Sequence, residues 1–190
     1  VGLKPGKYRF ASRSREEVRE ALDLPLDAIL LISVGELNRN KNHRVIIQAM
    51  ARLPQLPLYY ILCGKGKEAE FLQELAQSLH LSNRVRILGY RQDVCDLLHA
   101  SDIFCFPSKR EGLGMAALEA MEAGLPLVTS NIHGIRDYSL SGETGFACSV
   151  SNVEEFAHAI ETLSENRNLR KRMGTYNQQA VEAFYQAKTD

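Results

Sequence analysis

The chain has 190 residues, of which 45% are hydrophobic and 24% are charged, so it is long enough for one globular domain and too apolar for a disordered segment. Its 23 basic and 23 acidic residues cancel, which argues against a nucleic-acid-binding protein, because such proteins usually have a basic excess. No apolar run approaches the roughly 20 residues that a helix needs to span a membrane.

The first thirteen residues are basic, contain glycine and have a turn-like composition, so we expect residues 1–13 to form a linker. Residues 14–22 follow as a short predicted helix, because Ser14 and Glu17 have the spacing of a capping box. The chain begins at Val1 without a methionine, and we expect it to be one domain of a longer protein.

From residue 28 onward, continuous apolar runs alternate with stretches of helical periodicity. The apolar runs are typical of buried parallel strands and predict strands at residues 28–34, 58–63, 85–88, 103–106 and 125–130, with a short sixth strand at 145–147. The periodic stretches predict helices at residues 43–53, 67–79, 94–100 and 114–123. This alternation predicts an α/β fold with a Rossmann-like, doubly wound parallel sheet of about six strands.

The C-terminal part is predicted to contain helices without intervening strands. Residues 153–163 are amphipathic and follow a second capping box, and one or two further helices are expected over residues 169–184. We therefore predict a folded domain over residues 14–168 and a helical tail over residues 169–190.

The four cysteines form no C-x-x-C pair. Two of them, Cys63 and Cys105, lie inside apolar runs, where a reduced thiol packs as a small hydrophobic side chain. We therefore expect a cytoplasmic protein with reduced thiols and without a structural zinc.

The segment 104–124, FCFPSKREGLGMAALEAMEAG, combines a short strand, a glycine loop and a helix N-terminus. Backbone N–H groups of the loop 112–114 and the helix dipole favour a bound phosphate at such a place. Glu111 and Glu119 lie eight positions apart, and carboxylates accept hydrogen bonds from hydroxyl groups. These residues predict a phosphorylated ligand that also has hydroxyl groups.

The same segment resembles the E-x7-E motif of the family-4 retaining glycosyltransferases, which have the two-domain GT-B fold. Other motifs of that family follow in the expected order: G-x-L-x-x-x-K from Gly35 to Lys41, G-x-G at Gly64 and Gly66, and a turn glycine at Gly145. The variant SVGELN-x-NKNH is similar to the subgroup that builds bacterial exopolysaccharide and capsule. The resemblance extends over nearly the whole chain and implies the C-terminal, donor-binding half of a GT-B enzyme.

The resemblance implies two catalytic residues. Lys41 would lie on the diphosphate of the sugar donor, where a fixed cation stabilises the charge of the leaving group. Glu111 would contact hydroxyls of the donor sugar or stabilise the positive charge that develops at its anomeric carbon. From the residues alone, Lys41 could also belong to a solvated basic loop, because Arg39 and Arg44 lie nearby.

Further residues are implied to bind the nucleotide. Glu119 would bind the ribose hydroxyls, although together with Glu122 it could also mark a solvated helix face. Tyr90 and Arg91 would contact the base, while a surface aromatic without a role is the alternative for Tyr90.

Many family members have a phosphate-binding arginine where this chain has Glu36. We therefore expect either that Arg39 or Lys109 binds the phosphates instead of this arginine, or that phosphate binding is weaker than in those members. The segment 133–137 resembles a G-G-x-P-E turn of the family, and like the turn at 142–145 it is expected to be structural. The complete set of expected donor-binding residues is Gly35, Glu36, Arg39, Lys41, Gly64, Gly66, Tyr90, Arg91, Glu111, Gly112, Leu113, Gly114 and Glu119.

The function implied is retaining transfer of a sugar, of the hexosyltransferase type, from a nucleoside-diphosphate sugar to a glycan or lipid-linked acceptor, with a UDP-sugar as the preferred donor. No cofactor and no metal are expected, because the chain has no D-x-D motif. The acceptor site would belong to an N-terminal domain of the same protein, to which the tail would cross back, and that protein could associate with the inner membrane face.

Alone, this domain is expected to transfer nothing, and its tail to be displaced or to pack non-natively. The alternatives to a retaining glycosyltransferase are a GT-B phosphorylase, a sugar-nucleotide epimerase and a non-catalytic nucleotide-binding module.

Overall fold

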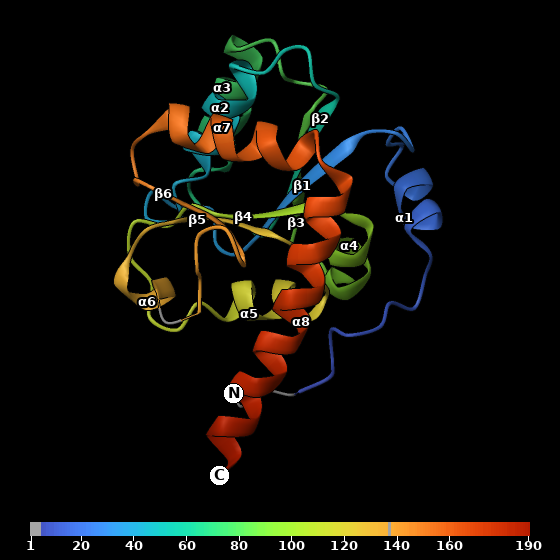
Figure 1. Cartoon of the computed structure of the whole chain (residues 1–190). Helices are drawn as coiled ribbons and strands as arrows, with labels where there is room; N and C mark the ends of the chain where they lie inside the picture. The colour runs from blue at the N-terminus through green and yellow to red at the C-terminus, as the bar shows by residue number, and fades with distance from the viewer. Residues whose placement is uncertain (1–4, 137) are drawn as a thin grey trace.

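A parallel β-sheet with helices on both faces forms the centre of the computed structural model, which describes residues 5–136 and 138–190 (Figure 1). The strand order is β3-β2-β1-β4-β5-β6, and neighbouring strands pair in parallel. The strands are β1 Ile29–Val34, β2 Leu58–Cys63, β3 Val85–Gly89, β4 Ile103–Phe106, β5 Leu127–Ser130 and β6 Gly145–Cys148. The predicted doubly wound sheet is therefore confirmed.

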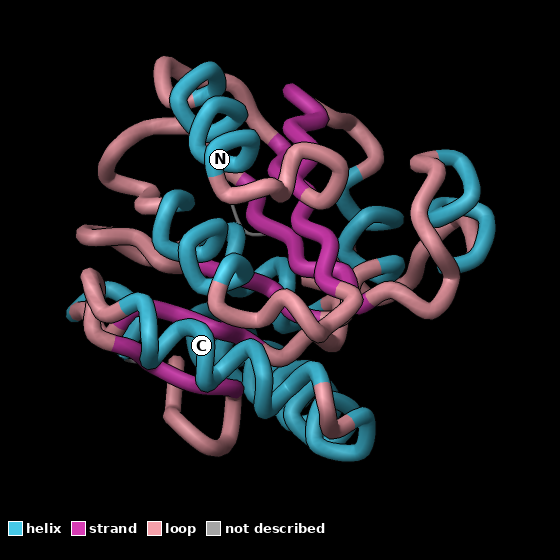
Figure 2. Tube along the Cα trace, turned by 90° about the horizontal axis from the view of Figure 1, so that it is seen from above, coloured by secondary structure: helices cyan, strands magenta, loops and turns pink. Residues whose placement is uncertain are grey.

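The helices form a layer on each side of the sheet, as the view from above in Figure 2 also shows. Apolar side chains of α2, α3 and α7 pack on one face, and those of α1, α4, α5 and the C-terminal half of α8 pack on the other. The helix bounds are α1 Arg15–Ala21, α2 His43–Ala51, α3 Ala69–Ser78, α4 Val94–Ala100, α5 Met115–Glu122, α6 His133–Arg136, α7 Val153–Ser164 and α8 Arg167–Thr189. None of the described helices is both long and apolar enough to cross a membrane.

Strand β1 occupies the middle of the sheet because it is apolar toward both helix layers. Its residues Leu30, Leu31 and Ile32 are buried, and successive side chains of a strand point to opposite faces. It pairs with β2 on one side and with β4 on the other. The winding direction therefore reverses between β1 and β4, and the loops after these two strands meet at the carboxyl edge, where open α/β sheets bind ligands.

The segment 133–136 differs from the expected turn. It forms the one-turn helix α6, in which the N–H group of Arg136 donates to the carbonyl of Ile132, and it places Ile135 in the core. The segment is thus a single helical turn, and the burial of Ile135 agrees with the structural role expected for it. Asp137 of the same motif lies outside the described residues.

The tail forms a single helix, α8, which packs against the domain and lies alongside α5. Asn177 is fully buried, and its Nδ2 donates to the carbonyl oxygens of Leu125 at 2.7 Å and Thr144 at 2.9 Å. Gly174 lies so close to Gly124 that a Cβ atom would be 2.1 Å from the carbonyl oxygen of that residue. The expectation of a displaced tail is therefore wrong. The crossing of the tail to another domain stays a prediction.

Residues 5–13, expected as a linker, lie against α4 and α5. The backbone N–H of Ser12 donates to Asp96 on α4 at 2.7 Å, and Arg13 forms an ion pair with the same carboxylate at 3.1 Å. The backbone N–H of Tyr8 donates to Glu122 on α5 at 2.6 Å. This segment therefore has a defined path over the face of the sheet that carries α5.

Candidate functional site

A hollow of about 440 Å³ lies where the loops after β1 and β4 meet the start of α5. Its walls come from two segments that are far apart in the sequence, 34–41 and 106–119, and six of the expected site residues are among them. The lining residues are Val34, Gly35, Lys41, Phe106, Glu111, Leu113, Gly114, Met115, Ala116 and Glu119. The fold thus brings the G-x-L-x-x-x-K loop and both glutamates of the E-x7-E motif to one place.

Lys41 and Glu111, the two expected catalytic residues, are in direct contact. The Lys41 Nζ atom lies 2.6 Å from Oε1 of Glu111, and the hydroxyl of Ser108 donates to the same oxygen at 2.8 Å. The ammonium group also lies 5.8 Å from the ring centroid of Phe106. Because Lys41 is ion-paired and its side chain is only 23% exposed, it is not part of a solvated basic loop.

Asparagine side chains fix the two loops that carry this pair. Asn38 accepts a hydrogen bond from the backbone N–H of Lys41 at 3.0 Å. Asn40 bonds through its amide group to the backbone N–H and carbonyl of Arg110. Asn42, at the start of α2, donates to the carbonyl of Pro107 at 3.1 Å. Sequence reasoning missed these residues, although their N-x-N-x-N spacing directly after a buried strand is a signal for a loop held by side-chain amides.

The N-terminus of α5 forms one wall of the hollow. Gly114 precedes the helix with φ 73°, and a Cβ atom there would lie 2.2 Å from the hydroxyl oxygen of Tyr138. Met115 and Ala116, the first two helical residues, line the hollow. The positive end of the helix dipole is therefore directed at the space beside Lys41, and both favour an anion.

The α6 segment supports the loop that contains Glu111. A Cβ atom at Gly134 would lie 2.1 Å from the carbonyl oxygen of Glu111 and 2.2 Å from that of Gly112. Only a glycine permits this close approach of the two backbones. Residues 133–136 thus support the loop that contains Glu111 from outside the hollow.

Glu119 lines one side of the hollow and is partly buried. Burial raises the pKa of its carboxyl group, while a side-chain hydrogen bond with Tyr8 and the charge of Lys7 act in the opposite direction. Glu122, one turn further along α5, is only 5% exposed and accepts the hydrogen bond from the Tyr8 backbone. The interpretation of these two glutamates as a solvated helix face is therefore wrong.

Gly64 and Gly66 do not line the hollow but shape the loop beside it. A Cβ atom at Gly64 would lie 1.9 Å from the carbonyl oxygen of Gly35, and one at Gly66 would lie 2.2 Å from that of Leu37. The two glycines let the loops after β1 and β2 come into contact, and the backbone N–H of Leu37 donates to the backbone carbonyl of Lys65. Their structural contribution is to place the loop that leads to Lys41.

The remaining expected residues lie on the surface outside the hollow. Glu36 and Arg39 are exposed, as is Gly112 in the loop before α5. Tyr90 is 72% exposed. Arg91 bonds to both carboxylate oxygens of Asp93 at 2.9 and 2.8 Å, and these bonds lower the pKa of the Asp93 carboxyl group.

Neither candidate for the missing arginine reaches the hollow. Lys109, like Arg39, is exposed, and its backbone N–H donates to the carbonyl of Asn40 at 2.8 Å. Among the described residues, the positive groups that line the hollow are therefore Lys41 and the N-terminal end of α5.

A doubly wound parallel sheet with a helix N-terminus, an ammonium group and two carboxylates at its switch point is the arrangement of an α/β domain of the GT-B class. The chain belongs to the family of glycosyl transferases group 1, whose family model matches residues 14–180. This membership confirms the family that the E-x7-E motif indicates.

Named relatives support the same assignment. The chain is 34% identical to the lipopolysaccharide core biosynthesis glycosyltransferase LpsE of Rhizobium meliloti, in a match that covers 88% of the chain and 51% of LpsE. It is 33% identical to the D-inositol 3-phosphate glycosyltransferase of Corynebacterium urealyticum, over 90% of the chain and 43% of that protein. The chain spans about half the length of these relatives.

Among solved structures, Alr3699/HepE of Anabaena has a similar fold. It has a TM-score of 0.89 and 24% identity, and the match covers 99% of this chain and 55% of HepE. HepE was solved in complex with UDP and also with UDP-glucose. At this level of identity the likeness shows the fold alone.

Proposed function

We propose that this domain binds a nucleoside-diphosphate sugar, with UDP as the nucleotide, and forms the donor half of a retaining glycosyltransferase. The observation that supports this most directly is the meeting of Lys41, Glu111 and Glu119 in one hollow at the N-terminus of α5. Such a site offers positive groups for a diphosphate and carboxylates for sugar hydroxyls. The UDP complexes of HepE favour uridine as the base.

Lys41 is proposed to stabilise the leaving diphosphate. An ammonium group has three hydrogen-bond donors, so Lys41 can keep its bond to Glu111 and also bind a phosphate oxygen. When the bond between the anomeric carbon and the phosphate oxygen breaks, negative charge grows on that oxygen. A cation fixed beside it lowers the barrier more than a cation that must be recruited from solvent.

Glu111 is proposed to bind the sugar. The hydrogen bonds that Lys41 and Ser108 donate both end on Oε1, so Oε2 can accept a hydrogen bond from a donor-sugar hydroxyl. The carboxylate also stabilises the positive charge that develops at the anomeric carbon. In this reaction the acceptor oxygen attacks from the face that the phosphate leaves, and its proton passes to the leaving phosphate, which gives retention.

The acceptor, its site and the location of the whole protein are further proposals. We propose an N-terminal domain that binds a glycan or lipid-linked acceptor, a place in surface polysaccharide synthesis, and a cytoplasmic position at the inner membrane face. The similarity to LpsE supports the polysaccharide assignment.

Calorimetric titration of the chain with UDP, GDP, NADH and inorganic phosphate tests the donor site. We expect UDP or GDP to bind, and both Lys41→Ala and Glu119→Ala to weaken binding about tenfold or more, because each removes a hydrogen bond to or from a charged group. Lys171→Ala on α8 is the matched control, since this exposed cation lies outside the hollow and should leave binding unchanged. Phosphate binding without nucleotide binding would instead indicate a phosphorylase, and nucleotide binding that ignores both substitutions would overturn the proposed site.

A further inference from the structure

A cavity of about 480 Å³ lies at the amino edge of the sheet. It is lined by the residues directly before β4 and β5, by Ile29 at the start of β1, and by the first two turns of α8. The strands are parallel, so their amino ends are at the edge opposite the one where the donor hollow lies. The proposed function uses no part of this cavity.

Positive charge is in excess in this cavity, which we call the basic cavity. Four cations line it: Arg15 at the start of α1, and Arg167, Arg170 and Lys171 on α8. Two carboxylates, Asp27 and Asp102, line it as well. The charge of Asp102 is already balanced by the fully buried Arg19, whose Nη2 lies 2.9 Å from it. The four cations therefore face only the exposed carboxylate of Asp27.

Two of the four cations are held in fixed positions. Nη2 of Arg15 lies 2.6 Å from the carboxylate of Asp102. Nη1 of Arg170 donates to two carbonyls at the C-terminal end of α7, at 2.6 and 3.0 Å. The Nε and Nη2 groups of Arg170 have no hydrogen-bond partner among the described residues, so their N–H groups are available to a ligand. Guanidinium groups that are fixed in advance lose less conformational entropy when an anion binds.

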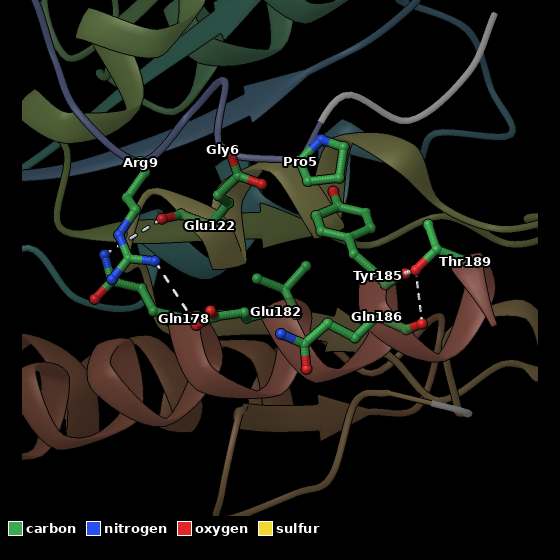
Figure 3. A pocket seen from close by; sticks show the side chains of 10 residues that line it. Pro5, Gly6, Arg9, Glu122, Gln178, Glu182, Tyr185, Gln186 and Thr189 are labelled. Atoms are coloured by element: carbon green, nitrogen blue, oxygen red, sulfur yellow. Dashed lines mark hydrogen bonds and ion pairs between the residues drawn. The ribbon is translucent and has the colours of Figure 1, made fainter.

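The cavity at the other end of α8 shows how a cation is neutralised within this domain. Figure 3 shows this cavity, of about 330 Å³, with Arg9 and Glu182 among the residues that line it. These two side chains form an ion pair at 3.7 Å. The three α8 cations of the basic cavity, in contrast, form no ion pair with any carboxylate of residues 5–136 and 138–190. An anion from outside the chain would supply the missing negative charge.

We propose that the basic cavity is a second anion site of the domain, which binds a phosphate group at the edge of the sheet opposite the donor hollow. Guanidinium groups suit phosphate because their planar N–H donors can form two parallel hydrogen bonds with its oxygens. The excess of positive charge favours a ligand with two or more negative charges. The proposal does not depend on the proposed function, because Lys41 and the N-terminus of α5 take no part in it.

Two sources supply this chemistry. One is a free phosphate compound, for which pyrophosphate is the probe. The other is the headgroups of an anionic lipid surface, which attracts clustered cations and accepts apolar side chains beside them. Leu26, which is 62% exposed, lines the same cavity. The experiments below distinguish the two sources.

The first experiment is an NMR titration of the nitrogen-15-labelled chain with pyrophosphate. We expect the backbone amide signals of residues 101–102 and 167–171 to shift. The double variant Arg167→Gln/Lys171→Gln should weaken this binding about tenfold, because it removes two cations. Both positions are exposed, so the fold should be unaffected. Arg9→Gln removes the cation of the other cavity and is the matched control, which should bind pyrophosphate like the wild-type chain.

Binding of pyrophosphate in the donor hollow has a different signature. It would shift the signals of residues 35–41 and 111–116, and it would be weakened by Lys41→Ala and not by the double variant. UDP binding in the hollow should be the same in the double variant and in the wild-type chain. The two proposed sites can therefore fail independently of each other.

The second experiment is sedimentation with vesicles of phosphatidylglycerol and phosphatidylcholine, compared with vesicles of phosphatidylcholine alone. Binding to the anionic vesicles that the double variant loses, without any shift by pyrophosphate, supports the site and assigns its phosphate to lipid headgroups. Shifts by pyrophosphate at the basic cavity that the double variant weakens support it and assign a free phosphate compound. If neither probe binds, or if the double variant binds like the wild-type chain, the proposal is overturned.

Discussion

His43 shows how the site region limits stability at low pH. It is the first residue of α2, it is 5% exposed, and its Nδ1 atom has no hydrogen-bond partner among the described residues. Burial, and to a lesser degree the charge of Lys41, lowers its pKa from 6.5 to about 4. The folded state therefore keeps His43 neutral over a pH range in which the unfolded chain binds a proton.

This titration gives a prediction with a definite sign. Between about pH 6.5 and pH 4 the unfolded state binds more protons at His43 than the folded state, so the free energy of unfolding falls as the pH is lowered through this window. The contribution is on the order of 3 kcal/mol across the window. Urea unfolding at several pH values in this window gives the free energy of unfolding at each pH. This free energy should change less with pH for His43→Phe than for the wild-type chain. The same pH dependence in both would contradict the assignment of a buried neutral imidazole.

At the scale of elements, helix α8 depends on one buried amide. Asn177 is the polar contact between this helix and the loops that flank β5, through its bonds to Leu125 and Thr144. We expect Asn177→Ala to lower the free energy of unfolding by about 1–3 kcal/mol, because the buried carbonyl of Leu125 loses its donor. Asn168→Ala, at an exposed position of the same helix, is the control and should change stability little. Chemical denaturation measures both, and an Asn177→Ala variant that is as stable as Asn168→Ala would contradict the role of this buried amide.

The sequence predicts elements well where a local pattern determines them. The apolar run of β1 and the strand, glycine loop and helix around Glu111 are visible in the sequence, and with the rules for parallel sheets they place Lys41 and Glu111 at one edge. The helix α6 is not visible, because it depends on burial of Ile135 by residues distant in the sequence. The burial of Glu122 is hidden for the same reason: its hydrogen-bond donor is Tyr8, 114 positions away.

For the whole molecule, the share of its relatives' length that the chain covers bears on whether it can transfer sugar. It spans about half the length of LpsE, and the hollow described above contains the groups that we propose for binding the donor. We expect the 190-residue chain to bind nucleotide and to transfer no sugar. Release of UDP from a panel of UDP-sugars, measured with and without simple sugar acceptors, checks this. Release above the rate of the Lys41→Ala variant would contradict the expectation.

The ion pair between Lys41 and Glu111 has a consequence for folding. Its partners are 70 positions apart in the sequence, and the segment between them contains β2 and β3. They come together only when β4 pairs with β1 in the sheet. Closing a loop of this length early in folding is entropically unfavourable, so the site is expected to form late and together with the central sheet. A ligand that binds across the pair therefore binds only the completed fold, and its binding free energy adds to the global stability of the domain rather than to that of one loop.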